Sequence, residues 1–332
     1  MTVVYLLAAL ALILVSAELF TNGVEWFGRA FELGEGAVGS VLAAVGTALP
    51  ETLIPIIAIL FTHSAGSHDI GIGAILGAPF MLSSLTMVVT GGAVVVFYLR
   101  GRRSLDFSIN EPVLRRDLSF FVVAYALAML AGAIPVHHFK WILSPCLLAG
   151  YGWYVWRTVS GGGELEGETK PLYFHRRRPV MPHRARIILQ VVVATLGIIL
   201  GARFFVGQVQ HVSASLGLDP LLVSLILSPL ATELPEKFNS VIWVRQGKDT
   251  LALGNITGAM VFQSTFPVSI GLIFTAWELT RTGLVSGVLA LISGSVFYLQ
   301  LRFRHKLTWF TLGGAGSMYA LYLVYVIFIA RA

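Results

Sequence analysis

Long apolar runs separated by short polar stretches recur along the whole chain. An α-helix rises about 1.5 Å per residue, so about 20 apolar residues cross the hydrocarbon core of a bilayer. Runs of this length are too long for strands, and they lack the polar face of the helices in water-soluble proteins. The pattern predicts an all-α membrane protein with ten transmembrane helices, at residues 3–26, 37–61, 70–99, 118–135, 139–157, 187–209, 221–244, 250–276, 282–301 and 307–330.

Composition agrees with this class and excludes others. Of the 332 residues, 56% are hydrophobic and only 12% are charged, which excludes an ordinary water-soluble fold. The net charge of +6 does not indicate a nucleic-acid partner, because the basic residues lie in short loops between apolar runs. The single cysteine, Cys146, can form no internal disulfide. No motif indicates a bound cofactor, and nothing in the sequence indicates an oligomeric state.

The basic residues are distributed unequally between the two sides of the predicted bundle. The loops after spans 1, 3, 5, 7 and 9 contain 18 Lys and Arg residues, whereas the opposite side contains 3. Because loops rich in Lys and Arg stay in the cytoplasm, the odd-numbered loops are expected there and both termini outside. The sequence therefore predicts a multi-pass protein of the cell (inner) membrane.

Two similar motifs place a Pro and a Glu inside apolar runs, one pair ending at Glu51 and the other at Glu236. A carboxylate at membrane depth costs about 2.5–3.5 kcal/mol, so its presence there indicates a function. The Pro before each Glu removes a backbone N–H and frees the carbonyl four residues earlier. A threonine four residues before each Glu, Thr47 or Thr232, lies on the same helix face. Carboxylate, hydroxyl and carbonyl oxygens are the ligands that Na⁺ and Ca²⁺ prefer.

The two motifs belong to an internal repeat. A shift of 185 residues superposes Thr47 and Glu51 on Thr232 and Glu236, and a shift of 181 superposes a second block that includes two glycines. The second block pairs Gly73 with Gly254 and Gly77 with Gly258. Each copy holds five predicted spans, an odd number, so the copies should be inverted in the membrane around a site at the midplane. The paired glycines also suit close helix packing. We expect a first repeat at 1–158, a cytoplasmic linker at 159–184 and a second repeat at 185–332.

At these residues the chain resembles the sodium/calcium exchanger (cation/Ca²⁺ antiporter) superfamily, whose two repeats each carry a Gly-Thr-Ser-x-Pro-Glu motif and a following Gly-Asn-x-x-Gly-Ser-Asn motif. The resemblance implies that Glu51 and Glu236 bind Ca²⁺ and help to bind Na⁺. It implies Thr47 and Thr232 as co-ligands. A further ligand position of the family corresponds to Leu82 in the first copy and to Gln263 in the second, where a neutral oxygen is kept.

The chain also departs from the family pattern. Ala48 and Glu233 replace the serines of the first motif, and Ala78 and Ala259 replace those of the second. Several hydroxyls that build Na⁺ sites in the family are therefore missing, while one carboxylate is gained. Glu233 is open to three interpretations: a cation ligand, a proton carrier, or a partner of the lysine four residues later. The candidate metal ligands are Thr47, Glu51, Thr232, Glu233, Glu236 and Gln263.

These observations favour a secondary antiporter that exchanges Ca²⁺, or a similar divalent cation, for Na⁺ or H⁺ by alternating access. Its partners would be inorganic cations and the lipid bilayer. Two alternatives remain on the same scaffold: a monovalent cation/H⁺ exchanger, and a relative that binds ions without transporting them. An intramembrane enzyme is disfavoured, because the sequence contains no His-Glu-x-x-His motif, paired aspartates or nucleophile elbow. A channel is disfavoured because the acidic residues do not form rings along a pore.

Overall fold

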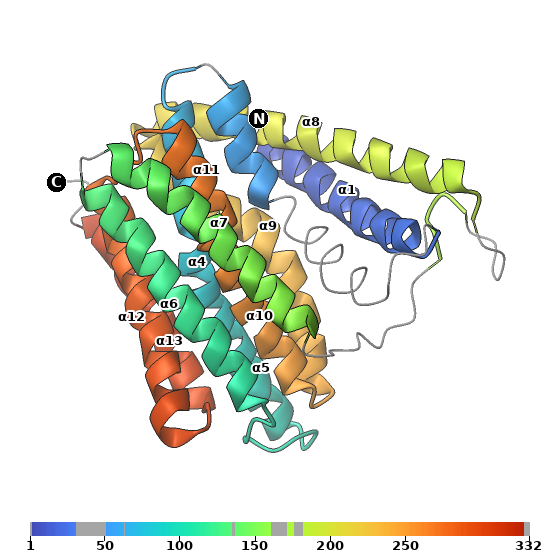
Figure 1. Ribbon diagram of the computed structural model, residues 1–332, viewed down its shortest axis with the longest axis vertical. Helices are drawn as coiled ribbons and strands as arrows, with labels where there is room; N and C mark the ends of the chain where they lie inside the picture. The colour runs from blue at the N-terminus through green and yellow to red at the C-terminus, as the bar shows by residue number, and fades with distance from the viewer. Residues whose placement is uncertain are drawn as a thin grey trace.

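The computed structural model describes residues 2–30, 51–62, 64–134, 137–160, 171–175 and 182–328, and this part of the chain contains helices and no strand (Figure 1). A first group of helices precedes residue 161: α1 (Thr2–Ala30), a helix at Glu51–Phe61 that ends in the π-helical turn η2 (Ile57–Phe61), α4 (Ser67–Met81), the π-helical turn η3 (Leu82–Thr86), α5 (Met87–Leu99), α6 (Glu111–Ala133) and α7 (His137–Ser160). A second group follows it: α8 (Arg184–Leu216), α9 (Pro220–Arg245), α10 (Asp249–Gln263), α11 (Phe266–Phe274), α12 (Arg281–Arg304) and α13 (Trp309–Phe328).

The described helices have the length and composition of membrane spans. Within the described residues, six stretches are long and apolar enough to cross a bilayer: Val4–Phe27, Ser67–Leu99, Arg184–Leu216, Asp249–Phe274, Arg281–Arg304 and Trp309–Phe328. Two shorter apolar helices, Glu51–Phe61 and Pro220–Leu230, begin or end next to the Pro-Glu motifs. This all-helical, apolar architecture agrees with the class predicted from the hydrophobic pattern.

Helix ends follow local capping chemistry, which apolar length alone does not locate. The side chain of Asn110 accepts a hydrogen bond from the Val113 N–H (3.4 Å), and Pro112 lies in the first turn of α6. For this reason α6 begins at Glu111, seven residues before the predicted apolar span at 118–135. Asp219 caps α9 in the same way, by accepting from the backbone N–H two residues later (2.9 Å).

Two of the predicted spans are irregular at corresponding places. In the span at 70–99, the π-helical turn η3 begins three residues after Pro79. In the span at 250–276, the helix breaks at residues 264–265, and Pro267 lies in the first turn of α11, where a missing N–H needs no partner. The shift of 181 residues that relates the glycines superposes Leu82, the first residue of η3, on Gln263, the last of α10.

The helices form one large bundle with a pair of long helices beside it. Figure 1 shows α1 and α8 running side by side and extending away from α6, α7, α12 and α13. Small residues allow their close contact, because a Cβ atom on Gly201 would lie 2.7 Å from Ile13 Cγ1. The main core lies within the bundle and contains the fully buried aromatic side chains Phe80, Phe121 and Tyr125.

A short segment of the predicted linker is bound to the α1–α8 pair. Leu172 is 1% exposed and packs on both helices. The Asn22 side-chain oxygen accepts from the Tyr173 N–H (3.2 Å) and from Gln190 Nε2 (3.0 Å). The Gln190 side-chain oxygen accepts in turn from the Phe174 N–H (2.9 Å). Backbone groups of this segment therefore find partners on two helices that are far apart in the sequence.

Candidate functional site

Helix α9 carries the second Pro-Glu motif in one continuous helix. Thr232 and Glu233 are 2% and 1% exposed, so a hydroxyl and a carboxyl group are adjacent in the protein interior. Glu236 lies almost one turn further along the same helix, and its side chain is outside the described part of the structure. Carboxyl groups are rarely buried unless they are paired or bind an ion, so this part of α9 is the centre of the candidate site.

A row of buried hydroxyls leads along α9 to this motif. The Ser224 hydroxyl donates to the Ile70 carbonyl of α4 (2.6 Å) and lies 2.9 Å from the Ser228 hydroxyl. Thr232 Oγ1 donates to the Ser228 carbonyl (3.1 Å). Ser224 and Ser228 were not among the predicted site residues. Their signal was present, because hydroxyl residues spaced four apart, ending four residues before Glu236, share one face of a helix.

The glycines of the first copy lie in the contact between α4 and α9. A Cβ atom on Gly73 would lie 2.3 Å from the Leu221 carbonyl oxygen, and one on Gly77 would lie 2.2 Å from the Leu225 carbonyl oxygen. Pro229 has no N–H to bond the Leu225 carbonyl, so this oxygen is free to face α4. Gly73 and Gly77 therefore serve close helix packing, as their spacing suggested. They let α4 lie against the helix that carries Thr232 and Glu233.

Substitution of Gly77 by Ala should separate these two helices. The added methyl would overlap a backbone carbonyl and the Pro229 ring, neither of which can move alone, and such overpacking costs about 1–3 kcal/mol. We expect the detergent-solubilised variant to melt at a lower temperature than the wild type. Gly92→Ala is the matched control, because a Cβ there meets no atom within 4 Å. Equal melting temperatures for the two variants would contradict the close approach.

Gln263 ends α10 at the helix break and is 2% exposed. Its counterpart Leu82 is fully buried at the start of η3 and offers no oxygen. The turn η3 packs against both α9 and α10, and α9 also packs against α10. The element that carries Gln263 is therefore a direct neighbour of the element that carries Thr232 and Glu233.

The first Pro-Glu motif is described from Glu51 onward. Glu51 is the first described residue of the helix at Glu51–Phe61 and is 7% exposed, and Thr52 beside it is 6% exposed. The end of this helix, η2, packs against α4, α8 and α11. Thr47 lies outside the described residues. The structure thus buries Glu51, Thr232, Glu233 and Gln263 and places their helices around α4 and η3.

A buried carboxylate that the sequence analysis did not single out contacts α10. Asp117 of α6 is 2% exposed and accepts hydrogen bonds from Arg116 (3.0 Å), Tyr154 (3.0 Å) and Thr257 (2.9 Å). Thr257 lies between the two glycines of the second-copy motif. The Asp117 charge is balanced by Arg116, so we assign this cluster to joining α6, α7 and α10. The adjacent pair Arg116-Asp117 directly before an apolar run was its only signal in the sequence.

The donor set is suited to a hard cation. Carboxylate, hydroxyl and side-chain amide oxygens match the oxygen ligands that Ca²⁺ and Na⁺ take. In the part of the chain that the structure describes, no three His, Cys, Asp or Glu side chains are grouped as metal ligands. A set of three carboxylates would therefore need Glu236, which the repeat pairs with Glu51, in addition to Glu51 and Glu233.

Comparisons with known proteins show a matching protein family and similar solved structures. A family model described as sodium/calcium exchanger protein matches residues 1–159 and 186–330. The putative antiporter CaxA of Alkalimonas amylolytica is 23% identical over 271 residues, which cover 81% of this chain and 80% of that protein. The solved structure of the H⁺/Ca²⁺ exchanger CAX is similar with a TM-score of 0.74 at 15% identity, over 98% of this chain and 82% of that chain. The sodium-calcium exchanger NCX_Mj is similar with a TM-score of 0.59 at 19% identity, over 99% of this chain and 98% of that chain.

Structural likeness at these identities shows the fold alone. The family model, by contrast, covers both halves of the chain and leaves out little more than the stretch between α7 and α8. Its match includes both Pro-Glu motifs and both glycine-containing blocks. The chain therefore belongs to the sodium/calcium exchanger family, whose members are transmembrane cation/Ca²⁺ antiporters and not enzymes.

Proposed function

We propose that this protein is a secondary antiporter that exchanges Ca²⁺, or a similar divalent cation, for Na⁺ or H⁺ by alternating access. The observation that carries the proposal is the burial of Glu51 and Glu233, from the two Pro-Glu motifs, in a bundle of helices apolar enough to span a membrane. A carboxylate at membrane depth is costly, and a cation offsets its charge. The proposed site comprises Thr47, Glu51, Thr232, Glu233, Glu236 and Gln263.

The proposed architecture is a pair of inverted five-helix repeats, with ten spans, both termini outside and the site near the bilayer midplane. Its support comes from the irregular positions of the two halves, since η3 and the break after Gln263 are related by the same shift of 181 residues. Further support comes from α1 and α8, which correspond in the repeat and pack against each other. Interrupted helices at matching places of two inverted halves characterise alternating-access transporters.

The chemistry of the site favours a divalent cation as one substrate. Two carboxylates, from Glu51 and Glu236, offset its two positive charges, and neutral oxygens from Thr232 and Gln263 complete its coordination. Glu233 is then available to carry a proton, because a carboxyl group near other carboxylates binds H⁺ more readily. Relatives with either coupling ion exist, since CAX is named an H⁺/Ca²⁺ exchanger and NCX_Mj a sodium-calcium exchanger.

Ion flux in proteoliposomes tests the proposal. Purified protein is reconstituted with Ca²⁺ inside, and Na⁺, K⁺ and pH gradients are imposed in turn while Ca²⁺ release is followed with a fluorescent indicator. We expect release driven by a Na⁺ or a pH gradient and none from protein-free vesicles. Na⁺ or K⁺ flux driven by a pH gradient without any Ca²⁺ movement would instead identify monovalent cation/H⁺ exchange. Ca²⁺ binding to the pure protein without flux under any gradient would refute transport.

The substitution Glu233→Gln distinguishes coupling to H⁺ from coupling to Na⁺. Because Gln has the same size but cannot bind a proton, the substitution should remove Ca²⁺ release driven by a pH gradient if Glu233 carries H⁺. If Glu233 carries H⁺, Ca²⁺ release driven by a Na⁺ gradient should change much less. The measurement is the ratio of the two initial rates in one vesicle preparation. An unchanged ratio would exclude Glu233 as the proton carrier.

A further inference from the structure

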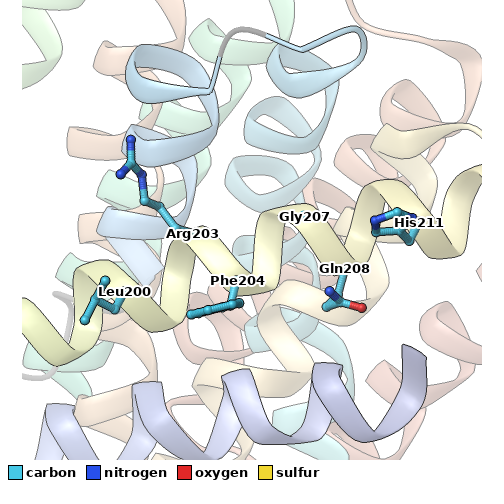
Figure 2. A pocket seen from close by; sticks show the side chains of 6 residues that line it. All are labelled: Leu200, Arg203, Phe204, Gly207, Gln208 and His211. Carbon is cyan, nitrogen blue, oxygen red and sulfur yellow. The ribbon is translucent and has the colours of Figure 1, made fainter. Parts of the chain in front are cut away.

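Polar side chains outside the proposed site can act together only where they converge. Arg203 and His211 line a hollow on α8, but Figure 2 shows their side chains pointing away from each other, so they form no common site. The carboxylate of Asp117 is different, because side chains from α6, α7 and α10 all donate hydrogen bonds to it. This cluster is therefore the place to look for a further contribution to transport.

The two oxygens of Asp117 bond different helices. Oδ1 accepts from the Tyr154 hydroxyl of α7 (3.0 Å), and Oδ2 accepts from the Thr257 hydroxyl of α10 (2.9 Å). Asp117 and Thr257 are 2% and 1% exposed, so water does not compete for the bond between them. Hydrogen bonds to an ionised acceptor are also stronger than those between neutral groups. The bond to Oδ2 thus holds Thr257, and with it α10, at a fixed distance from α6.

The glycines on either side of Thr257 are not held by close packing against described residues. A Cβ atom on Gly254 would meet no described atom within 4 Å, and one on Gly258 would meet only the Tyr154 hydroxyl, at 3.9 Å. The matching glycines of the first copy differ, because they fit tightly against backbone carbonyls of α9. Within the described structure, this stretch of α10 is therefore held to α6 by the hydrogen bond of Thr257 and not by a glycine contact.

The position of Thr257 determines the position of Gln263. The two residues are six positions apart on one continuous helix, which is about 9 Å along its axis. Gln263 is the last residue of α10 before the break and is 2% exposed. Its counterpart in the first copy, Leu82, has no side-chain oxygen that could replace it. A shift of α10 would therefore move the amide oxygen of Gln263 without compensation from the other repeat.

We infer that Asp117 is a positioning residue of the transport site, which acts through Thr257 to set where α10 presents Gln263 to the cation. The inference rests on the proposed function, because it assumes that Gln263 is a ligand. Asp117 itself binds no cation, since Arg116 balances its charge and its oxygens accept hydrogen bonds from side chains of three helices. Supporting groups of this kind control ion affinity by fixing the geometry of the ligands.

Two substitutions that each remove one hydrogen bond to Asp117 test this inference. Thr257→Val keeps the shape of the side chain and removes the bond to α10, so the Ca²⁺ concentration that half-saturates exchange should rise about tenfold, with little change in the maximal rate. Thr257→Ser keeps the hydroxyl and should behave as the wild type does. Tyr154→Phe is the matched control, because it removes the bond from α7 and leaves the bond to α10. It should lower the melting temperature about as much as Thr257→Val without changing the half-saturating concentration.

Initial rates of Ca²⁺ exchange in proteoliposomes are measured over a range of Ca²⁺ concentrations for all four proteins. Calorimetric Ca²⁺ binding to the detergent-solubilised proteins provides a second measurement that needs no transport, and Thr257→Val should weaken binding by the same factor. If the wild type exchanges Ca²⁺ and Thr257→Val has its half-saturating concentration, Asp117 only stabilises the fold and the inference is overturned. Equal increases in Thr257→Val and Tyr154→Phe would overturn it too. A wild type that neither binds nor moves Ca²⁺ would refute the proposed function itself, and this inference with it.

Discussion

Glu51→Gln should reduce Ca²⁺ exchange by roughly 100-fold or more, since leaving one charge of a buried set uncompensated costs about 3–5 kcal/mol. The substitution preserves the size of a side chain that is only 7% exposed and removes its negative charge. A divalent cation at this site would then face too little negative charge to offset the loss of its hydration. Initial rates of Ca²⁺ release from proteoliposomes, normalised to the amount of reconstituted protein, measure the effect.

Glu278→Gln is the matched control, because it makes the same chemical change at an exposed carboxylate between α11 and α12. It should exchange Ca²⁺ at the wild-type rate. Glu51→Asp, which keeps the charge and shortens the side chain, should fall between the two. If Glu51→Gln exchanged Ca²⁺ as fast as Glu278→Gln while folding normally, Glu51 would not be a cation ligand.

The overall helical architecture was predictable because its signals are local. Apolar length predicted the long helices, and Pro79 and Pro267 lie close to the places where the spans at 70–99 and 250–276 are irregular. Helix ends were less accurate, as at α6, because caps depend on single polar residues outside the apolar run. Whether an irregularity is a π-helical turn, as in η3, or a break, as after Gln263, depends on neighbouring helices and could not be predicted from the sequence.

The sequence allowed most residues of the candidate site to be identified, but not the contacts between the helices that carry them. Repeat spacing and family resemblance indicated Glu51, Thr232, Glu233 and Gln263, and all four are buried. Thr47 and the Glu236 side chain, which lie outside the described part, stay predictions. Ser224 and Ser228 were overlooked because serine is common in apolar helices, where it bonds its own backbone and costs little. A serine that bonds its own helix is distinguished from one that joins two helices only when the neighbouring helix is known. Ser224 is of the second kind, since it donates to a carbonyl of α4.

Charge counting predicted the side of the membrane for the basic loops but not what each charge binds. Arg103 was one of five basic residues in the predicted loop between the spans at 70–99 and 118–135. In the structure it lies against Asp249, which is 146 positions away in the sequence. No local pattern predicts such a pairing, because it depends on how α5, α6, α9 and α10 come together.

Arg103→Ala should be the most destabilising loop substitution. The Arg103 guanidinium bonds both carboxylate oxygens of Asp249 (2.8 and 2.9 Å) as well as the carbonyls of Val244 (2.9 Å) and Asp106 (3.0 Å). Asp249 also accepts from the Ser108 N–H (2.9 Å). The two side chains are 7% and 2% exposed, so removing Arg103 leaves a buried charge without its partner. Breaking such a pair costs about 3–5 kcal/mol.

We expect the melting temperature of the detergent-solubilised protein to fall by roughly 5 °C or more. Unfolding is monitored by tryptophan fluorescence. Arg102→Ala, at the exposed neighbouring position, should change the melting temperature little. The double variant Arg103→Met, Asp249→Leu removes both charges and should recover part of the loss, because an apolar pair leaves no charge uncompensated. A double variant as unstable as Arg103→Ala would show that the loop is held by its other hydrogen bonds. In that case the ion pair would not be what joins the α5–α6 loop to the start of α10.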